Sequence, residues 1–157
     1  MLLDSTDMRI LYILVRDART PFRQIAKELG IGESTVYVRI RKLLDMGILK
    51  GFTAIVDLDK LGYGVMAFIE VKVKPQVLGG ITGRITGVKG VVEVYEVSGE
   101  YPLIAKVVAS SNAELSRIID DIGRIEGVDS LNVRYVLRKI SYEASSLEVQ
   151  RIIKELV

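Results

Sequence analysis

The sequence predicts an α+β fold: an N-terminal three-helix helix-turn-helix domain followed by a ferredoxin-like βαββαβ domain with an antiparallel sheet. Three observations lead to this prediction. Apolar residues recur at helical spacing through the first fifty residues, where a Gly-Ile-Gly turn separates two short helical stretches. Strictly alternating stretches begin after residue 64. From there the stretches follow in the order strand, helix, strand, strand, helix, strand.

The first part of the chain is expected to form three helices. The first opens at Asp4, which suits the N-cap, and the second at Thr20-Pro21, where a capping hydroxyl precedes proline in the first helical position. The third runs from about Glu33 to Met46 and ends at Gly47. Their apolar stripes are Ile10, Leu11 and Leu14, then Ile25, Ala26 and Leu29, then Val36, Ile40 and Leu43.

The second part is expected to alternate between strands and helices, after a short strand pair or an extended connector at 48–57. The expected elements are a strand at 65–73, a glycine-rich helix at 76–86, strands at 91–97 and 101–109, a helix capped by Ser111, a strand at 131–137 and a terminal helix at 146–156. The expected domains are a helix-turn-helix domain at 1–57, a linker at 58–63, a ferredoxin-like domain at 64–141 and a C-terminal helix at 142–157.

The composition narrows the chemistry that the chain can perform. The sequence holds no cysteine and no histidine, which removes thiolates, the usual general base and the most frequent metal ligand. We therefore expect no metal, no cofactor and no enzymatic activity. No apolar run approaches the ~20 residues of a membrane span, and acidic residues stand near the start, where an export signal carries basic ones. We accordingly expect a cytoplasmic protein without a membrane partner.

The third helix is expected to expose a face suited to double-stranded DNA. Helical geometry of about 100° per residue places these side chains outward or at the flanks of that face: Ser34, Thr35, Tyr37, Val38, Arg41 and Lys42. In a major groove Arg41 would read guanine or clamp a phosphate, the hydroxyls would bond base edges or phosphates, and Val38 would touch a thymine methyl. The cations expected to bind phosphate are Arg39, Lys42, Arg19 and Arg23. The alternative is an ordinary solvated helix face.

One face of the expected sheet should remain uncovered, because both helices of the ferredoxin-like domain lie on the other face. The uncovered face would carry Met66, Phe68, Ile104, Val108 and Val136. An exposed apolar patch of this kind usually marks an interface, so we expect a homodimer; a shifted strand register would swap the two faces. A dimer would set two recognition helices ~34 Å apart or a multiple of that distance, which predicts a palindromic operator.

Nearly the whole chain resembles one family. The run LDSTDMRILYILVRDARTPFRQIAKELGIGESTVYVRIRKLLDMGILKGFTAIVD resembles the opening of the Lrp/AsnC, or feast/famine, family of regulators. The resemblance continues through DKLGYGVMAFIEVKV, VVEVYEVSGEYPLIAKV and VDSLNVRYVLRKI, and so covers residues 2 to about 140. No single motif is decisive, but the ordered set is highly specific.

The resemblance implies transcriptional regulators that bind palindromic DNA with the third helix. It implies homodimers built through the C-terminal domains, often assembled into tetramers or octamers, and sometimes tuned by an amino-acid effector. The effector site would lie at the turn between the second and third strands, here Ser98, Gly99, Glu100 and Tyr101.

Three features depart from the family pattern. Pro102 stands where the family commonly has Asp, which removes a backbone donor and a carboxylate from the expected effector site. Gly32 replaces a capping Ser before the third helix. The terminal helix at 146–156 goes beyond the resemblance.

Three other functions remain open at this point. The first is an architectural DNA-binding protein of the same fold without an effector. The second is an enzyme, since some haem-biosynthesis decarboxylases resemble this family in architecture, although they rely on the histidine that this chain lacks. The third is an interaction module whose basic helix docks a protein; steep weakening of binding with salt would favour DNA instead.

Overall fold

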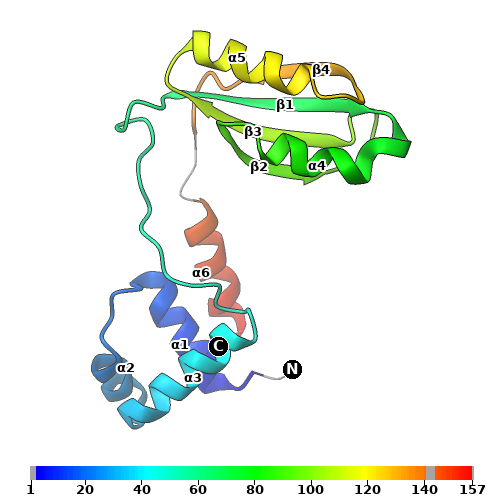
Figure 1. The fold of residues 1–157 in the computed structure, drawn as a ribbon. Coiled ribbons are helices and arrows are strands. Elements are labelled where there is room, and N and C mark those ends of the chain that lie inside the picture. Colours follow the sequence, from blue (N-terminus) through cyan, green and yellow to red (C-terminus); the bar gives the residue numbers. More distant parts are fainter. Residues whose placement is uncertain (1–2, 141–143, 157) are drawn as a thin grey trace. The chain divides into compact units, whose positions relative to one another are not determined.

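The computed structural model describes residues 3–140 and 144–156. Within this part the chain divides into two compact units, which we call the helical unit, Met1–Ala54 with Ile140–Val157, and the sheet unit, Ile55–Lys139 (Figure 1). The division after Ala54 falls a few residues before the linker expected at 58–63. The domain limits expected at 1, 141, 142 and 157 lie outside the described residues.

The helical unit contains the three expected N-terminal helices and the C-terminal one. They are α1 (Ser5–Arg16), α2 (Phe22–Leu29), α3 (Glu33–Asp45) and α6 (Ala144–Leu156). The apolar stripes expected from the sequence meet in one core, in which Ile10, Ile25, Val36 and Leu43 are fully buried. Hydrophobic periodicity alone therefore predicts which face of α1, α2 and α3 is buried.

The caps of these helices follow the sequence at two points and depart from it at one. The Asp4 carboxylate accepts the backbone N–H of Asp7 at 2.9 Å and caps α1 as expected. Gly47, just beyond the α3 C-cap, adopts a left-handed φ of 69°, which a glycine accommodates without strain. The expected cap at Thr20 is wrong, because its hydroxyl donates to the carbonyl of Asp17 at 2.8 Å and Pro21 is the N-cap of α2.

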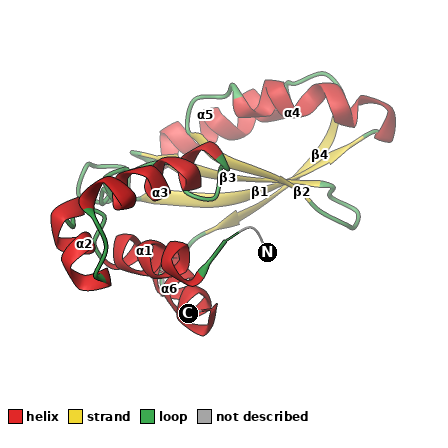
Figure 2. Ribbon diagram, turned by 90° about the horizontal axis from the view of Figure 1, so that it is seen from below, coloured by secondary structure: helices red, strands yellow, loops and turns green. Residues whose placement is uncertain are grey.

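The C-terminal helix packs against α1 and completes the helical unit. Figures 1 and 2 show α6 beside α1 from two directions, and the residue contacts agree. Ile153 is 8% exposed and belongs to the same core as Met8 and Leu11. The helix α6 begins at Ala144, two residues before the start at 146 that the sequence predicts. The helical unit is thus built from both ends of the chain.

The sheet unit confirms the ferredoxin-like prediction. Its described elements are β1 (Val65–Val73), a short 3-10 turn η1 (Pro75–Val77), α4 (Leu78–Thr86), β2 (Val91–Glu96), β3 (Leu103–Ala109), α5 (Asn112–Gly123) and β4 (Val128–Tyr135). The described strands form an antiparallel sheet in the order β2-β3-β1-β4. Before it, residues 51–57 form neither helix nor strand, so the extended connector is the alternative that the structure supports.

Both helices of the sheet unit cover the same face of the sheet (Figure 2). On this face β1 and β3 bury Ile69, Val71, Leu103 and Val107 completely, against Ile85 and other residues of α4 and α5. Side chains alternate along a strand, so the intervening residues of β1 and β3 point to the opposite, helix-free face. Over the described residues, no helix has both the length and the apolar character needed to cross a membrane.

Candidate nucleic-acid interface

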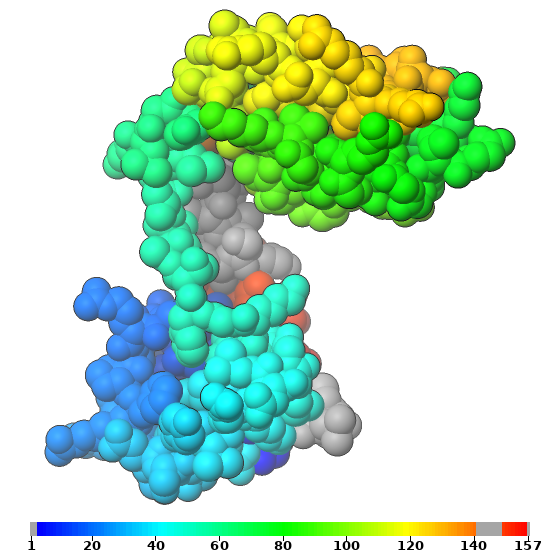
Figure 3. All heavy atoms as spheres, in the orientation of Figure 1, coloured from blue at the N-terminus to red at the C-terminus, as the bar shows by residue number. Residues whose placement is uncertain are grey.

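The outward face of α3 is exposed in the part of the helical unit that the structure describes. Val36, Ile40 and Leu43 are buried on the inner side, at 0%, 3% and 0% exposure, as the helical geometry predicts. On the outer side Val38 is 63% exposed, and Ser34, Thr35, Tyr37 and Arg41 are also exposed. Figure 3 shows α3, in cyan, along the visible surface of its unit. An apolar Val38 set between hydroxyls and a cation on an exposed helix suits base edges in a major groove.

The turn between α2 and α3 fixes this face relative to the core. Gly30 ends α2 in the left-handed region with φ of 68°, and the backbone N–H of Ile31 returns to the carbonyl of Ala26 at 3.0 Å. Gly32 is the N-cap of α3, where its carbonyl accepts the first backbone bonds of the new helix from Thr35 and Val36. The reversal therefore occupies only residues 30–32, as a helix-turn-helix requires.

Arg41 carries the strongest donor group on the exposed face of α3. Its side chain is 66% exposed and lies 3.8 Å from the Asp45 carboxylate, one turn further along the helix. An exposed pair at i and i+4 contributes only about 0.3–0.5 kcal/mol. Arg41 can therefore leave Asp45 for a base edge or a phosphate at small cost.

Two cations of α3 form ion pairs with the start of α1, a contact that the pattern of either helix does not predict. The Arg39 Nη1 atom donates to Asp4 at 2.6 Å and to Asp7 at 2.8 Å, and the Lys42 Nζ atom donates to Asp7 at 2.7 Å. Asp7 is fully buried, whereas the side chains of Arg39 and Lys42 are 26% and 40% exposed. The structure thus places two of the four expected phosphate-binding cations in ion pairs within the helical unit.

These contacts shift the pKa values of the carboxylates. The hydrogen bond from the Asp7 backbone and then the Arg39 side chain lower the pKa of Asp4. Burial raises the pKa of Asp7, but the hydrogen bonds from Lys42 and Arg39 outweigh it, so its pKa is also lowered. Both groups are accordingly charged near neutral pH.

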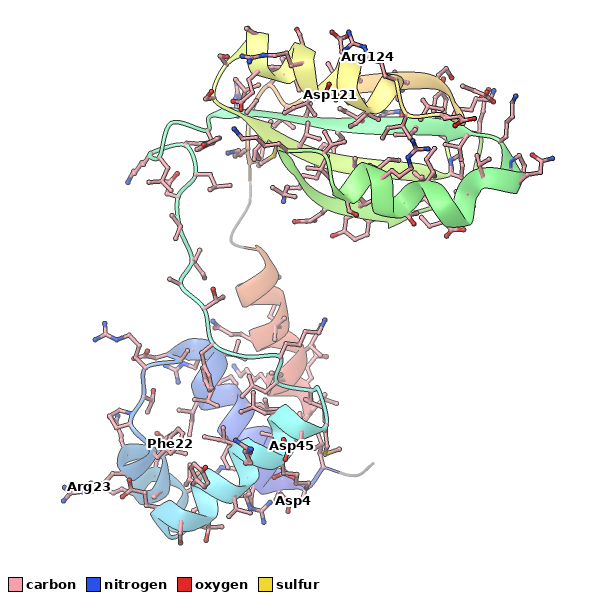
Figure 4. All side chains as sticks on the ribbon, in the orientation of Figure 1. Asp4, Phe22, Arg23, Asp45, Asp121 and Arg124 are labelled. Atoms are coloured by element: carbon pink, nitrogen blue, oxygen red, sulfur yellow. The ribbon has the colours of Figure 1, made fainter. Side chains whose placement is uncertain are left out.

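The remaining candidates surround α2. Arg23 on α2 is exposed and extends away from the unit in Figure 4, and Arg19 is exposed in the turn before α2. Tyr37 is 56% exposed and packs its ring against Phe22 at a centroid distance of 6.4 Å. Tyr37 therefore supports the junction of α2 and α3 while keeping its edge in solvent.

The net positive charge of the chain belongs to the helical unit. Residues 1–54 and 140–157 hold 11 Lys or Arg against 9 Asp or Glu, whereas residues 55–139 hold 11 of each. The formal charge of +2 thus falls entirely in the unit that contains α3. A positive unit attracts the phosphate backbone over the distances that salt leaves unscreened.

The turn expected to hold an effector connects β2 and β3. Gly99 has a φ of 118°, a conformation that favours glycine, and Ser98 and Glu100 are exposed beside it while Tyr101 is half-buried. Glu100 accepts a hydrogen bond from Lys72 of β1 at 2.6 Å, which lowers the pKa of Glu100 and raises that of Lys72. The turn is thereby tied to the sheet by an exposed ion pair.

The residues expected at a dimer interface share the helix-free face of the sheet. Met66 pairs with Val108, and Phe68 lies between Lys106 and Arg134 on the neighbouring strands. Val136 follows β4 and donates its N–H to the Met66 carbonyl at 2.9 Å, and Ile104 lies opposite Glu70. Phe68 is 38% exposed, whereas Val108 is already 8% exposed within one chain and offers little further area.

Comparison with known proteins agrees with this architecture. Residues 3–44 match the AsnC-type helix-turn-helix domain, and residues 66–145 match the Lrp/AsnC ligand binding domain. The HTH-type transcriptional regulator FL11 of Pyrococcus furiosus is 37% identical over 149 residues, which cover 95% of this chain and 98% of that relative.

Two solved structures share the fold. AsnC from Escherichia coli matches with a TM-score of 0.85 at 29% identity, over 90% of this chain and 97% of that one. A Neisseria meningitidis transcriptional regulator, solved as a complex with L-Met, matches with a TM-score of 0.81 at 21% identity, over 89% and 93%. Taken with the two domain matches and the FL11 relationship, these findings show that the chain belongs to the Lrp/AsnC family of transcriptional regulators.

Proposed function

We propose that this regulator binds a palindromic DNA operator as a homodimer, with α3 of each copy in the major groove, and that a small molecule such as an amino acid modulates the binding. The observation that carries the proposal is the exposed outer face of α3, with Ser34, Thr35, Val38 and Arg41 directed away from the core. A regulator of this kind acts where the DNA is, so we place it in the cytoplasm.

We assign base reading and phosphate binding to different residues. Arg41 offers a fork of donors that matches the O6 and N7 atoms of guanine, and Val38 offers a methyl surface for thymine. Arg19 and Arg23 are exposed cations at the start of α2, which suits contacts with the phosphate backbone. Tyr37 would lie at the edge of the same surface, beside α2.

Dimerisation would use the helix-free face of the sheet unit. Phe68 is the most exposed of the five apolar residues there, and Met66, Ile104 and Val136 extend the surface around it. Two copies with such faces in contact form an isologous pair, which places the two DNA-binding units around a twofold axis. A twofold axis in the protein requires a twofold axis in the operator. Tetramers or octamers would be built from these dimers.

The effector would bind at the turn Ser98–Tyr101. The matched ligand binding domain and the L-Met complex of the Neisseria protein, which shares the fold, support an amino-acid effector. Glu100 could receive an ammonium group only in competition with Lys72, which already donates to it. Titration calorimetry with the common amino acids tests this proposal, and a binding isotherm for one of them is the expected result.

A second candidate is an architectural DNA-binding protein without an effector. Pro102 favours it, because proline has no backbone N–H to offer a ligand at the end of the effector turn. The Glu100–Lys72 pair, which occupies the carboxylate of the turn, favours it as well. Absence of heat with every amino acid, together with intact DNA binding, would support this second function.

Selection of bound duplexes from a random DNA pool tests the proposed function as a whole. We expect enrichment of an inverted repeat whose half-sites lie one helical turn, or a multiple of it, apart. Enrichment of a single asymmetric site would contradict the dimeric arrangement. Failure to retain any duplex at low salt would contradict DNA binding itself.

A further inference from the structure

The acidic start of α1 faces the recognition helix. Asp4 and Asp7 together accept hydrogen bonds from Arg39 and Lys42, and each ion pair is 2.6–2.8 Å long. Figure 4 shows Asp4 at the edge of the helical unit, close to α3. These contacts join residues 32–35 positions apart in sequence, so they fix α3 against α1.

Helix capping alone does not require these charges. The cap of α1 needs an acceptor for the backbone N–H of Asp7, and asparagine or serine supplies one as well as aspartate does. The second oxygen of Asp4 and both oxygens of Asp7 also accept from the cations of α3. A neutral cap would lack these ion pairs, so the carboxylates do more than cap α1.

The acidic side chains also reach the expected DNA surface. One shallow depression is lined by Asp4, Ser34, Thr35, Val38, Arg39 and Lys42. Asp4 is 53% exposed there, beside side chains to which we assign base contacts. A phosphate that approaches Arg39 across this depression meets the Asp4 carboxylate, and like charges repel at this range.

We propose that Asp4 and Asp7 are positioning residues for DNA recognition, which hold Arg39 and Lys42 against α1 and thereby limit the contribution of these cations to phosphate binding. The inference rests on the proposed function. Phosphate attraction is the part of binding that does not depend on base sequence. By restraining it, the two carboxylates raise the fraction of the binding free energy that depends on Arg41, Val38 and the hydroxyls.

The variant Asp4→Asn tests this inference because asparagine keeps the cap and removes the charge. We expect it to bind a random-sequence duplex about three- to tenfold more tightly than the parent at low salt. Its dependence of log affinity on log salt, measured by fluorescence anisotropy between about 50 and 200 mM, should steepen by about 0.9, the value for one additional phosphate contact. Discrimination in favour of the selected operator should fall.

Two controls separate the positioning role from simpler explanations. Asp121→Asn removes one negative charge from the exposed surface of α5 in the sheet unit and should change neither quantity (Figure 4). The double variant Asp4→Asn with Arg39→Gln should return to the salt slope of the parent, because the guanidinium that no longer pairs with Asp4 is gone. A gain that survives in the double variant, or an equal gain with Asp121→Asn, would overturn the inference.

A second variant keeps the test decisive if Asp4→Asn unfolds. Lys42→Gln should leave the salt slope of the parent unchanged, whereas Arg19→Gln should reduce it by about 1. A reduction with Lys42→Gln equal to that with Arg19→Gln would overturn the inference. If the parent binds no duplex, the proposed function fails; if the parent binds and Asp4→Asn behaves identically, only the positioning role fails.

Discussion

Arg41 and Arg19 are both exposed cations of the helical unit, yet we expect them to contribute differently to DNA binding. Arg41 projects from the outer face of α3, where a guanidinium can read a base, whereas Arg19 lies in the turn before α2. Arg41→Ala should cost about 1–3 kcal/mol on the operator and relax the preference at one base pair. Arg19→Ala should weaken all sequences evenly. Anisotropy titrations with operator and single-substitution duplexes measure both, and equal behaviour of the two variants would contradict the assignment.

The Asp4 and Asp7 carboxylates link the stability of the helical unit to pH. Their pKa values are lower in the folded chain than the ordinary value of about 3.9. Groups of this kind contribute stability that is complete above the unfolded pKa and is lost as pH falls through the folded pKa. We expect the melting temperature of the full chain, measured by circular dichroism, to decrease as the pH is lowered below about 4. In Asp4→Asn this decrease should be less steep. An identical acid profile for the two proteins would contradict this account.

At the scale of single residues, the sequence predicts which side chains are exposed better than what they contact. Helical periodicity correctly places Val36, Ile40 and Leu43 inside and Val38 outside. It cannot show that Arg39 turns back to α1, because that pairing depends on how two helices cross, which the pattern of either helix alone does not contain. The spacing of Asp4 and Asp7 does not indicate these ion pairs by itself, because the same spacing fits a capping box.

The helix α4 contains three glycines that lower its stability without any close contact that requires them. A Cβ atom added to Gly79, Gly80 or Gly83 would meet no atom within 4 Å, and all three lie within the helix. Alanine at each should therefore raise the free energy of unfolding by about 0.5–1 kcal/mol, measured by urea titration.

Gly90 provides the opposite case to the glycines of α4. It has a φ of 96°, and a Cβ there would lie 2.4 Å from Ile118 Cδ1 and 2.9 Å from the Val108 carbonyl oxygen. Gly90→Ala should be destabilising by at least about 1 kcal/mol. Stabilisation by Gly90→Ala, or destabilisation by all three α4 variants, would contradict the packing of the sheet unit.

We expect the packing of α6 against α1 to stabilise the helical unit. Ile153 is 8% exposed against α1, whereas its neighbour Ile152 is 50% exposed. Ile153→Ala should lower the free energy of unfolding by about 2–4 kcal/mol, because it leaves a cavity in the helical core. Ile152→Ala should cost less than about 1 kcal/mol. Urea titrations of both variants test the docking of α6, and equal losses would argue against it.

At the scale of elements, the sequence predicts the order and type of the helices and strands because amphipathic periods of 3.6 and 2 are local properties. It misses cap details where a competing bond exists, as with the Thr20 hydroxyl, which donates to Asp17. It also leaves the partner of α6 undetermined, because an apolar stripe specifies that a helix is covered but not by which element. Only the assembled structure shows that α1 covers Ile153.

At the scale of the molecule, Phe68 and Val133 distinguish the two faces of the sheet. Each is 38% exposed, but Phe68 lies on the helix-free face, whereas Val133 pairs with Ile69 on the face that the helices cover. Phe68→Asp should place a charge in the proposed interface and shift the protein to monomers in sedimentation velocity. Val133→Asp should leave the association unchanged. Dissociation by Val133→Asp alone would show that the chain associates through a different surface.

If the outer face of α3 lies against a DNA duplex, a cleavage reagent attached to that face will cut the bound DNA nearby. Because the sequence contains no cysteine, Val38→Cys supplies one unique thiol for an iron-chelate cleavage reagent on the exposed face of α3, and Ile152→Cys supplies the matched thiol on α6. We expect the reagent at position 38 to cut the selected operator within each half-site, and the reagent at position 152 to leave it uncut. If the variant at position 38 binds the operator but does not cut it, or if position 152 cuts more strongly, the outer face of α3 does not lie against the DNA.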